Sequence, residues 1–298
     1  MSFESKNAVT VVIATLGGAS LASTIAALNQ GTVSPAEILI CIPSTDASKI
    51  TTAISDIANI KIIKTDFRGQ VAQRHWGFQH AAHDIVMQLD DDIWVDAQCI
   101  ERLLRTLHTL GPQIAVAPAL INQATGLSVY KKPARNKLIS TIYYWLMNGA
   151  AGYSPGRIDK SGSAVGADPA LSSNDIHDVE WLAGGCMMHY KKNLILENFW
   201  PLPGKAYYED TVHSFLLKNK GIRLVIDSRA QCSLELLGQT DLKLKHLFGV
   251  LYRDYLARQY FMKRIFQPSL RVYPYYFFRV ISYIYTRSKL FLKNNLWK

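Results

Sequence analysis

Three consecutive aspartates, Asp90-Asp91-Asp92, directly follow the apolar run Ile85–Leu89. The run predicts a buried strand, so three like charges gather at its end and repel one another unless a cation compensates them. Mg²⁺ and Mn²⁺ bind through few carboxylates and complete their shell with phosphate oxygens. On a continuing strand, Asp90 and Asp92 share a face and Asp91 points away. We therefore predict that Asp90 and Asp92 bind a divalent ion, with a solvated acidic turn as the alternative.

Two further segments carry charged side chains at predicted helix starts. Gly69 precedes a predicted helix whose first N–H groups suit an anion, and Arg74 lies on the following turn, where a plain surface arginine is the alternative. Glu209-Asp210 begins a helix about 120 residues after the triplet. Acidic residues at such a position are suited to cap the helix and to face its dipole.

The glycines Gly184-Gly185 lie in an otherwise strand-like segment, next to Trp181. Two glycines inside a strand indicate close approach of another backbone or of a ligand.

Alternating strand and helix patterns must position these residues. The predicted strands are Ala8–Thr15, Glu37–Ile42, Ile60–Lys64 and Ile85–Leu89, and the predicted helices are Ser20–Asn29, Val71–Ala82 and Ala97–Leu110. After a Gly/Ala/Ser-rich loop (Asn148–Ser173), further strands are predicted at Val179–His189 and Ile222–Ile226. This rhythm predicts an α/β fold with a mostly parallel, doubly wound sheet whose strand ends meet along one edge.

The order and spacing of the motifs resemble the family 2 glycosyltransferases. The resemblance rests on a strand near the N-terminus, the helix Gly69-x-x-x-x-Arg74-x-x-Gly77, Leu89-Asp90-x-Asp92 after a strand, and Glu209-Asp210 at a helix start. It covers residues 8–230. The family pattern Gly-x-x-x-Ala-Arg-Asn-x-Gly is altered here, because Gln73-Arg74-His75 replaces Ala-Arg-Asn.

The resemblance implies a GT-A fold with a Rossmann-like mixed sheet, a nucleotide-diphosphate sugar donor, Mn²⁺ or Mg²⁺, and inversion at the anomeric carbon. The site residues that it implies are Asp210 as general base; Thr15, Arg74, Asp90 and Asp91 for the donor; Asp92 and Asp90 for the metal, with His246 as a further ligand; and Trp181, Gly184, Gly185 and Glu209 for the acceptor. For His246, an ordinary surface or core histidine is the favoured alternative. For Asp210, N-capping of the helix is the competing explanation. Trp181 would stack on a sugar face of the acceptor, and a place in the core is the equally supported alternative. The acids that many members use to recognise uracil are missing after the second strand, where only Asp46 or Asp66 is available as a substitute.

The basic residues of the chain are concentrated in its C-terminal tail, residues 242–298. The net charge is +10, and residues 242–298 alone carry twelve Lys/Arg and one acid, Asp254. Lys, Arg, Tyr and Trp beside aliphatic residues favour a membrane headgroup region, so peripheral contact with an anionic membrane is predicted here. A helical cap that packs on the catalytic domain is the alternative. Nucleic acid is disfavoured, because no nucleic-acid motif accompanies the tail.

Other global features point to an intracellular enzyme. The four cysteines are scattered, which favours free thiols. No signal peptide is recognised, and no uncharged run reaches the roughly 18 residues needed to span a bilayer. We predict a cytoplasmic protein, peripheral on the inner face of the cell membrane, with a catalytic domain at 1–235 (a nucleotide-sugar half, 1–120, and an acceptor half, 121–235) and a helical basic extension at 236–298.

The predicted function is transfer of a sugar to a glycan or lipid-linked acceptor in cell-surface polysaccharide or glycolipid synthesis. A sugar nucleotidyltransferase is the alternative enzyme, but the segment Thr15–Ser20 lacks the Arg and Lys expected of its loop. A non-catalytic glycan- or lipid-binding relative is the third possibility, which the intact Asp90, Asp92 and Asp210 disfavour. A processive synthase is disfavoured by the absence of spanning segments in the sequence.

Overall fold

The computed structural model describes residues 7–131, 137–169, 173–202, 206–236, 244–265 and 269–295, without the side chains of 244–246, 265, 286 and 289–295. The chain divides into two compact units. Unit 1 comprises Met1–Lys131 and Ala167–Leu236, and unit 2 comprises Lys132–Gly166 and Leu237–Lys298. The predicted domain boundaries at residues 120 and 235 stay predictions.

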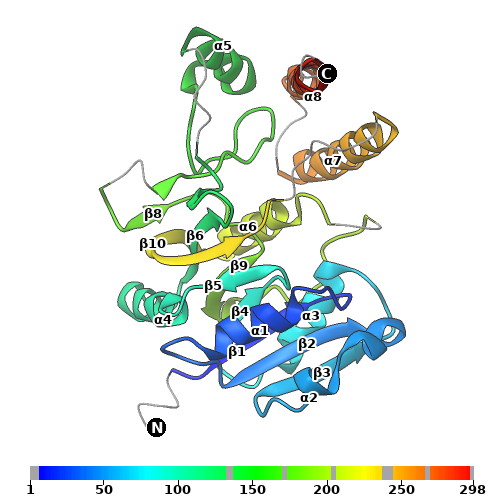
Figure 1. The fold of residues 1–298 in the computed structure, drawn as a ribbon. Helices are drawn as coiled ribbons and strands as arrows, with labels where there is room; N and C mark the ends of the chain where they lie inside the picture. The colour runs from blue at the N-terminus through cyan, green and yellow to red at the C-terminus, as the bar shows by residue number, and fades with distance from the viewer. Residues whose placement is uncertain are drawn as a thin grey trace. The chain divides into compact units, whose positions relative to one another are not determined.

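Unit 1 is built on a single mixed sheet (Figure 1). Its described strands are β1 (Val9–Ala14), β2 (Glu37–Pro43), β3 (Ile60–Thr65), β4 (Ile85–Leu89), β5 (Ile93–Val95), β6 (Ile114–Asn122), β7 (Leu127–Ser128), β8 (Ile176–Asp178), β9 (Cys186–Tyr190) and β10 (Arg223–Leu234). They follow the order β3-β2-β1-β4-β9-β6-β10-β5, with β7 beside β6 and β8 beside β10. The first four strands are parallel to one another, whereas β9 runs antiparallel to both of its neighbours.

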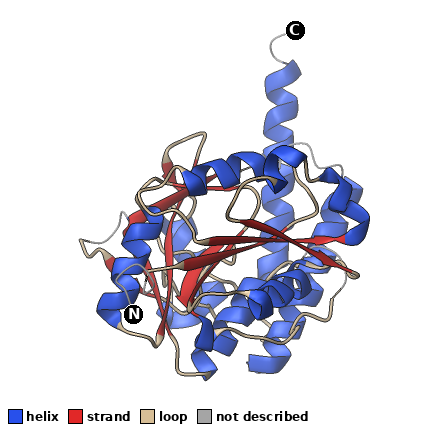
Figure 2. Ribbon diagram, turned by 90° about the horizontal axis from the view of Figure 1, so that it is seen from below, coloured by secondary structure: helices blue, strands red, loops and turns tan. Residues whose placement is uncertain are grey.

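Helices lie on both faces of the strands (Figure 2). Those of unit 1 are α1 (Leu21–Asn29), α2 (Thr52–Ser55), α3 (Gln70–His80), α4 (Cys99–Leu110) and α6 (Glu209–Asn219), with 3₁₀ turns η1 (Ser44–Lys49) and η4 (Lys191–Asn193). Helix α4 buries Ile100, Leu103, Leu104 and Leu107, a spacing that places all four side chains on one face. Gly77 allows α3 to lie against the sheet, because an added Cβ would come within 2.4 Å of Val12 and 2.6 Å of Cys41.

Unit 2 is helical in its described part. It contains α5 (Lys137–Asn148), η2 (Gly149–Ala151), α7 (Leu244–Ile265) and α8 (Val272–Asn295). The buried guanidinium of Arg258 in α7 donates to Ser163 Oγ at 2.9 Å and stacks on the Tyr275 ring of α8 at 4.1 Å. The predicted helical C-terminal part is thus confirmed.

The predicted α/β class with a mixed, mostly parallel sheet is also confirmed, but several boundaries differ. The strand predicted at Val179–His189 begins only at Cys186, and β10 continues to Leu234, well past the predicted end at Ile226. Strands β5 and β6 and helix α5 were not predicted. The loop expected at Asn148–Ser173 contains η2 and an isolated bridge between Ile158 and Ala164. The four cysteines are buried and form no disulfide, as expected.

Candidate active site

A pocket of about 540 Å³ lies at the carboxyl ends of β1 and β4, beside the start of α3. Its lining consists of Ala14, Thr15, Leu16, Gly18, Arg68, Gly69, Gln70, Gln73, Asp90, Asp91 and Asp92. The structure therefore brings four of the predicted site residues, Thr15 and the three aspartates, to one cavity. Arg68, Gln70 and Gln73 also line it, and sequence patterns did not assign them a role.

All three aspartates face this pocket, contrary to the predicted alternation of sides. The reason is that β4 ends at Leu89, so the acids lie in a turn and not on a strand. Asp90 Oδ1 accepts hydrogen bonds from Gln70 Nε2 at 2.9 Å and from Arg74. Asp91 accepts the Thr15 hydroxyl. Asp92 is the most exposed of the three.

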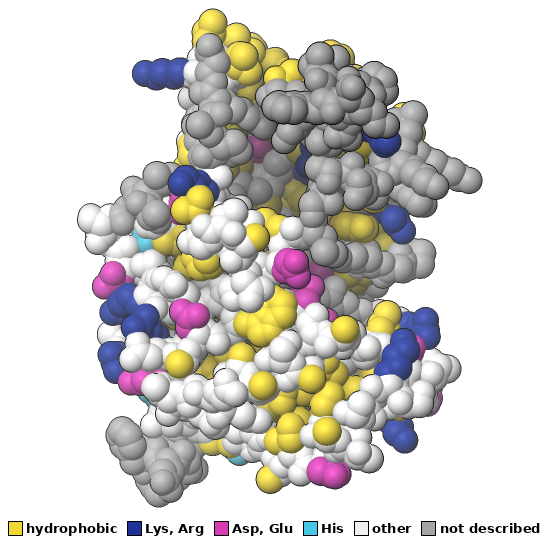
Figure 3. Space-filling model, viewed as in Figure 1, with side chains coloured by type: hydrophobic (Ala, Val, Ile, Leu, Met, Phe, Trp, Pro, Cys, Tyr) yellow, Lys and Arg dark blue, Asp and Glu magenta, His cyan; other side chains and the backbone are white. Residues whose placement is uncertain are grey.

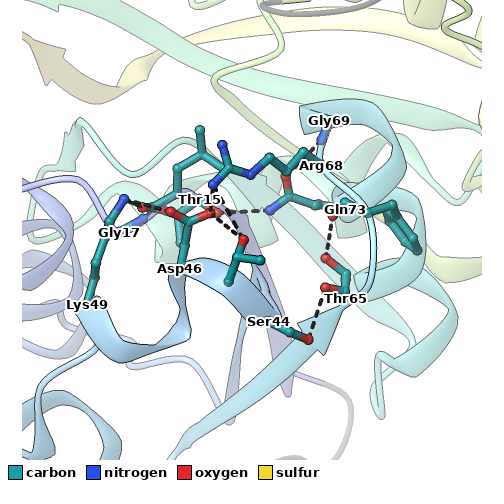
Figure 4. Close-up of polar contacts among 12 residues, drawn as sticks. Thr15, Gly17, Ser44, Asp46, Lys49, Thr65, Arg68, Gly69 and Gln73 are labelled. Atoms are coloured by element: carbon teal, nitrogen blue, oxygen red, sulfur yellow. Dashed lines mark hydrogen bonds and ion pairs between the residues drawn. The ribbon is translucent and has the colours of Figure 1, made fainter.

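Gln73 fixes the beginning of α3 to the sheet. Its side-chain amide donates to the carbonyl oxygens of Thr15 and Cys41 at 2.9 and 2.8 Å, while its Oε1 accepts the Gly69 N–H at 3.1 Å (Figure 4). The Gly69 N–H is thus used inside the protein, whereas binding of an anion by the first N–H groups of α3 stays a prediction. A glutamine within a helix has no distinctive spacing, which is why this role was not predicted.

A small ion-pair cluster borders the pocket at Arg68. The buried Asp46 carboxylate accepts Lys49 Nζ at 2.8 Å and Arg68 Nη2 at 2.6 Å, and Lys49 also donates to the Leu16 carbonyl (Figure 4). Asp46 was one of two candidates for recognising a nucleobase. Both of its oxygens already accept charged donors, and Arg68 is the member of this cluster that lines the pocket, so recognition of a nucleobase by Asp46 stays a prediction.

Arg74 joins the two acidic segments of the chain. Its Nη2 donates to Asp90 Oδ1 at 3.1 Å and its Nη1 to Glu209 Oε1 at 2.8 Å, and the residue is only 3% exposed. Burial disfavours the charged guanidinium, but the two carboxylates outweigh burial and raise the Arg74 pKa. The predicted surface alternative is wrong. In this structure Arg74 holds the acids of the site together, while its predicted contact with the donor stays a prediction.

Replacing Arg74 with methionine is expected to destabilise the fold by about 3 kcal/mol or more, because it leaves the buried Glu209 carboxylate without its counter-charge. Chemical denaturation of both proteins measures the loss. Arg68→Met is the matched control, since Arg68 is an exposed partner of Asp46 and such pairs contribute about 1 kcal/mol or less. Equal stability of the two variants would contradict the structural role of Arg74.

The two glycines predicted to lie near a ligand allow the acidic segments to meet. A Cβ on Gly184 would lie 2.6 Å from Glu209 Oε1 and 3.3 Å from Asp210 Cβ. A Cβ on Gly185 would lie 3.3 Å from Asp90 Oδ2 and 2.5 Å from the side chain of Ile93. Asp90 and Asp210 therefore flank adjacent residues. The predicted contact of these two glycines with an acceptor stays a prediction.

Glu209 and Asp210 form the first turn of α6, as predicted. Tyr208, immediately before them, has φ of 72°, an unfavourable backbone conformation for a residue with a side chain. Asp210 Oδ1 accepts the Thr211 N–H at 2.8 Å within the first turn. The N-cap residue is Tyr208, so neither Glu209 nor Asp210 is the N-cap of the helix, which was the competing explanation.

Burial makes Asp210 and Asp90 weaker acids than an exposed aspartate. It raises the pKa of Asp210 to about 7, helped by the neighbouring Glu209 charge and opposed by the hydrogen bonds from Thr211. Burial likewise raises the pKa of Asp90 to about 6, against the influence of Arg74. A carboxyl group that titrates near neutral pH is suited to accept a proton during a reaction.

Two predicted residues lie apart from this arrangement. Trp181 is 8% exposed and meets Tyr130 edge-on, with ring centroids 5.7 Å apart, which agrees with the core alternative; stacking on an acceptor stays a prediction. The side chain of His246 lies outside the described residues, although its backbone belongs to α7 of unit 2.

The side chains of the pocket that are able to coordinate a metal ion suit a hard divalent cation. It consists of carboxylate oxygens, of which those of Asp92 are the most exposed. Among the described residues, no three His, Cys, Asp or Glu side chains form a complete metal cage. Mg²⁺ and Mn²⁺ need only one or two carboxylates when a ligand's phosphates complete the shell, so the residues present are compatible with such an ion.

The fold matches the predicted GT-A glycosyltransferase fold. Among solved structures, the chain is similar to the crystal structure of GalNAc-T7 with UDP, GalNAc and Mn²⁺, with a TM-score of 0.55 and 16% sequence identity. The similarity covers 78% of this chain and 44% of that one, and it concerns the fold. No curated protein matches the sequence.

Residues 10–154, just under half of the chain, match the family model described as glycosyl transferase family 2. The matched region includes β1, α3 and the acidic triplet, which are the segments on which the resemblance was based. The predicted relationship to the family 2 glycosyltransferases is thereby confirmed.

Proposed function

We propose that this protein is an inverting glycosyltransferase that moves a sugar from a nucleotide-diphosphate donor to a hydroxyl group of a glycan or lipid-linked acceptor, with a divalent cation. The observation that carries the proposal is the Arg74 bridge. It brings Asp90, at the end of β4, and Glu209, next to Asp210, into one buried network although they are 119 positions apart in the sequence.

In this proposal the pocket residues hold the donor. Thr15 and the Asp90–Asp92 turn face its diphosphate end, with Asp92 and Asp90 holding the cation, and Arg68 lies at the border of the same cavity. A bound divalent ion would offset the negative charge that develops on the departing diphosphate. The supporting observation is that the three carboxylates and the start of α3 line the same cavity.

Asp210 then acts on the acceptor. It takes the proton from the acceptor hydroxyl as that oxygen attacks the anomeric carbon and the bond to the diphosphate oxygen breaks, which inverts the configuration. The raised pKa of Asp210 supports this role, because a base that titrates near pH 7 is both available and strong enough under neutral conditions. Glu209, Trp181 and the Gly184-Gly185 segment would border the acceptor.

Thermal shift with a set of nucleoside diphosphates and Mn²⁺ tests donor binding. One nucleotide is expected to raise Tm by a few degrees, because binding at ~100 times Kd stabilises the folded state by about 2.7 kcal/mol. The matching monophosphate, and the diphosphate with a chelator, are the controls. An unchanged Tm with every nucleotide would favour a non-catalytic glycan- or lipid-binding relative instead. A response to nucleoside triphosphates would favour a sugar nucleotidyltransferase.

We further propose peripheral contact of residues 242–298 with an anionic membrane at the inner face of the cell membrane, where the enzyme would act in polysaccharide or glycolipid synthesis. The basic, aromatic composition of this segment supports the contact. Among the described residues, no helix is long and apolar enough to cross a bilayer.

A further inference from the structure

The exposed hydrophobic side chains of this protein concentrate in unit 2. Thirteen of the nineteen large hydrophobic residues that are exposed in the described part of the chain belong to it, although it contains about a third of the sequence. Single exposed hydrophobics are common on soluble proteins, whereas a concentration of them marks an interaction surface.

Helix α5 presents its apolar side to solvent. Leu138, Ile142 and Trp145 are 67%, 49% and 57% exposed, and their spacing places them on one face. Of its three buried residues, Ser140 and Asn148 are polar and Met147 is apolar. This polarity is the reverse of that expected for a helix whose outer face meets water. Figure 3 shows hydrophobic side chains gathered over α5.

Helix α8 lies beside α5 and has a similar face. The rings of Tyr143 and Phe278 are 5.3 Å apart, and Arg271 Nη1 donates to the carbonyl oxygens of Trp145 and Leu146 at 2.9 and 2.7 Å. Along α8 the exposed large side chains recur on one face at Tyr273, Phe277, Ile281 and Ile284. Two neighbouring helices therefore each expose an apolar stripe.

The charge of unit 2 indicates what covers these stripes. Unit 2 contains 17 Lys/Arg and three acids, a net charge of +14, whereas unit 1 has a net charge of −4. A second copy would place +14 against +14, which opposes association of the two faces. An anionic bilayer satisfies both features, because its headgroups attract the basic residues and its acyl chains accept the apolar ones.

We propose that α5 is a membrane-inserting helix, whose Leu138, Ile142 and Trp145 enter the headgroup and acyl boundary of an anionic bilayer next to α8. This inference deepens the membrane contact proposed above, since it adds a helix from the middle of the chain to a contact that sequence patterns placed only in residues 242–298. It does not depend on the transferase reaction.

Trp145 provides a direct probe of insertion. Tryptophan fluorescence of the full chain is measured with phosphatidylcholine vesicles, with and without phosphatidylserine, that carry brominated acyl chains. Every protein in this series also carries Trp297→Phe, because Trp297 belongs to the segment 242–298 that is itself proposed to contact the membrane. We expect a blue shift and quenching only with phosphatidylserine, and loss of most of the quenching in Trp145→Phe. Trp76→Phe, which removes an exposed tryptophan of unit 1, is the matched control and should keep it. Absence of binding, or quenching that survives the removal of Trp145, would overturn the proposal.

A second pair of variants tests the aliphatic residues. Leu138→Gln combined with Ile142→Gln should lower vesicle affinity by about tenfold or more, because less apolar surface leaves water on binding. The Tm should not fall, since both side chains are already exposed. Leu127→Gln combined with Leu196→Gln, in unit 1, is the control with similar exposure.

Sedimentation and donor hydrolysis distinguish the other outcomes. A dimer in solution that the α5 variant dissociates would assign the face to a second copy and overturn the proposal, as would equal loss of vesicle binding in the control pair. Hydrolysis of the donor by the same variants in vesicle-free buffer should be unchanged. That measurement reports on the proposed transferase independently of membrane insertion.

Discussion

Replacing Asp210 with asparagine is expected to reduce glycosyl transfer about a thousandfold, because general-base catalysis contributes roughly 10²–10⁴ to such reactions. Asparagine keeps an oxygen that can accept the Thr211 N–H, so the change removes the base and preserves the helix start. Transfer is measured as kcat with saturating donor, and donor affinity and Tm are measured beside it. Both are expected to stay close to their original values.

The pH dependence of the unaltered enzyme provides an internal control for this assignment. Because the pKa of Asp210 is raised to about 7, the base is increasingly protonated below that pH, and kcat/KM should fall toward acid with a midpoint near 7. Glu197→Gln, which alters an exposed acid, should retain both the rate and the profile. Retention of more than a tenth of the activity by the Asp210 variant would exclude it as the base.

Replacing Asp92 with asparagine is expected to lower transfer by a similar factor, about a thousandfold, for a different reason. Charge stabilisation by a metal ion contributes several kcal/mol to a transition state, and about 1.4 kcal/mol corresponds to each factor of ten. Asp92 is the most exposed acid of the pocket, whereas Asp90 already accepts hydrogen bonds from Arg74 and Gln70. The change should therefore affect the bound ion more than the fold.

Calorimetric titration of the nucleoside diphosphate, with and without Mn²⁺, separates these effects. The original protein should bind more tightly with Mn²⁺, and Asp92→Asn should show little difference between the two conditions. Asp96→Asn, which changes an exposed aspartate four positions later, is the control and should behave like the original. If Asp92→Asn kept the full dependence on Mn²⁺, the ion would have to bind elsewhere.

The features that could be predicted from the sequence are those set by local pattern. The β-branched runs before Thr15 and Asp90 predicted β1 and β4, because strands buried on both faces are continuously apolar. The helix start at Glu209 was likewise predicted. Since parallel strands end along one edge, the pocket at the ends of β1 and β4 followed from these elements.

The missed features depend on contacts between distant segments. Arg74 and Glu209 are 135 positions apart in the sequence, so no local pattern predicts their ion pair. Nothing in the spacing of Gln73 indicates that its side chain joins α3 to two strands. Helix α5 was missed for another physical reason. A helix with this many apolar residues is expected to bury them in a core. In α5 the apolar Leu138, Ile142 and Trp145 are exposed, whereas the polar Ser140 and Asn148 are buried.

The path of the chain makes unit 2 more than a terminal attachment. The polypeptide leaves unit 1 after Lys131, forms α5, returns at Ala167 and leaves again after Leu236. Removing everything after residue 236 would therefore not yield an isolated unit 1. It would leave α5 without Phe278 and Arg271, the residues that pack on it and bind its last carbonyl groups. The natural way to separate the units is to replace 132–166 by a short linker in the same protein that ends at 236.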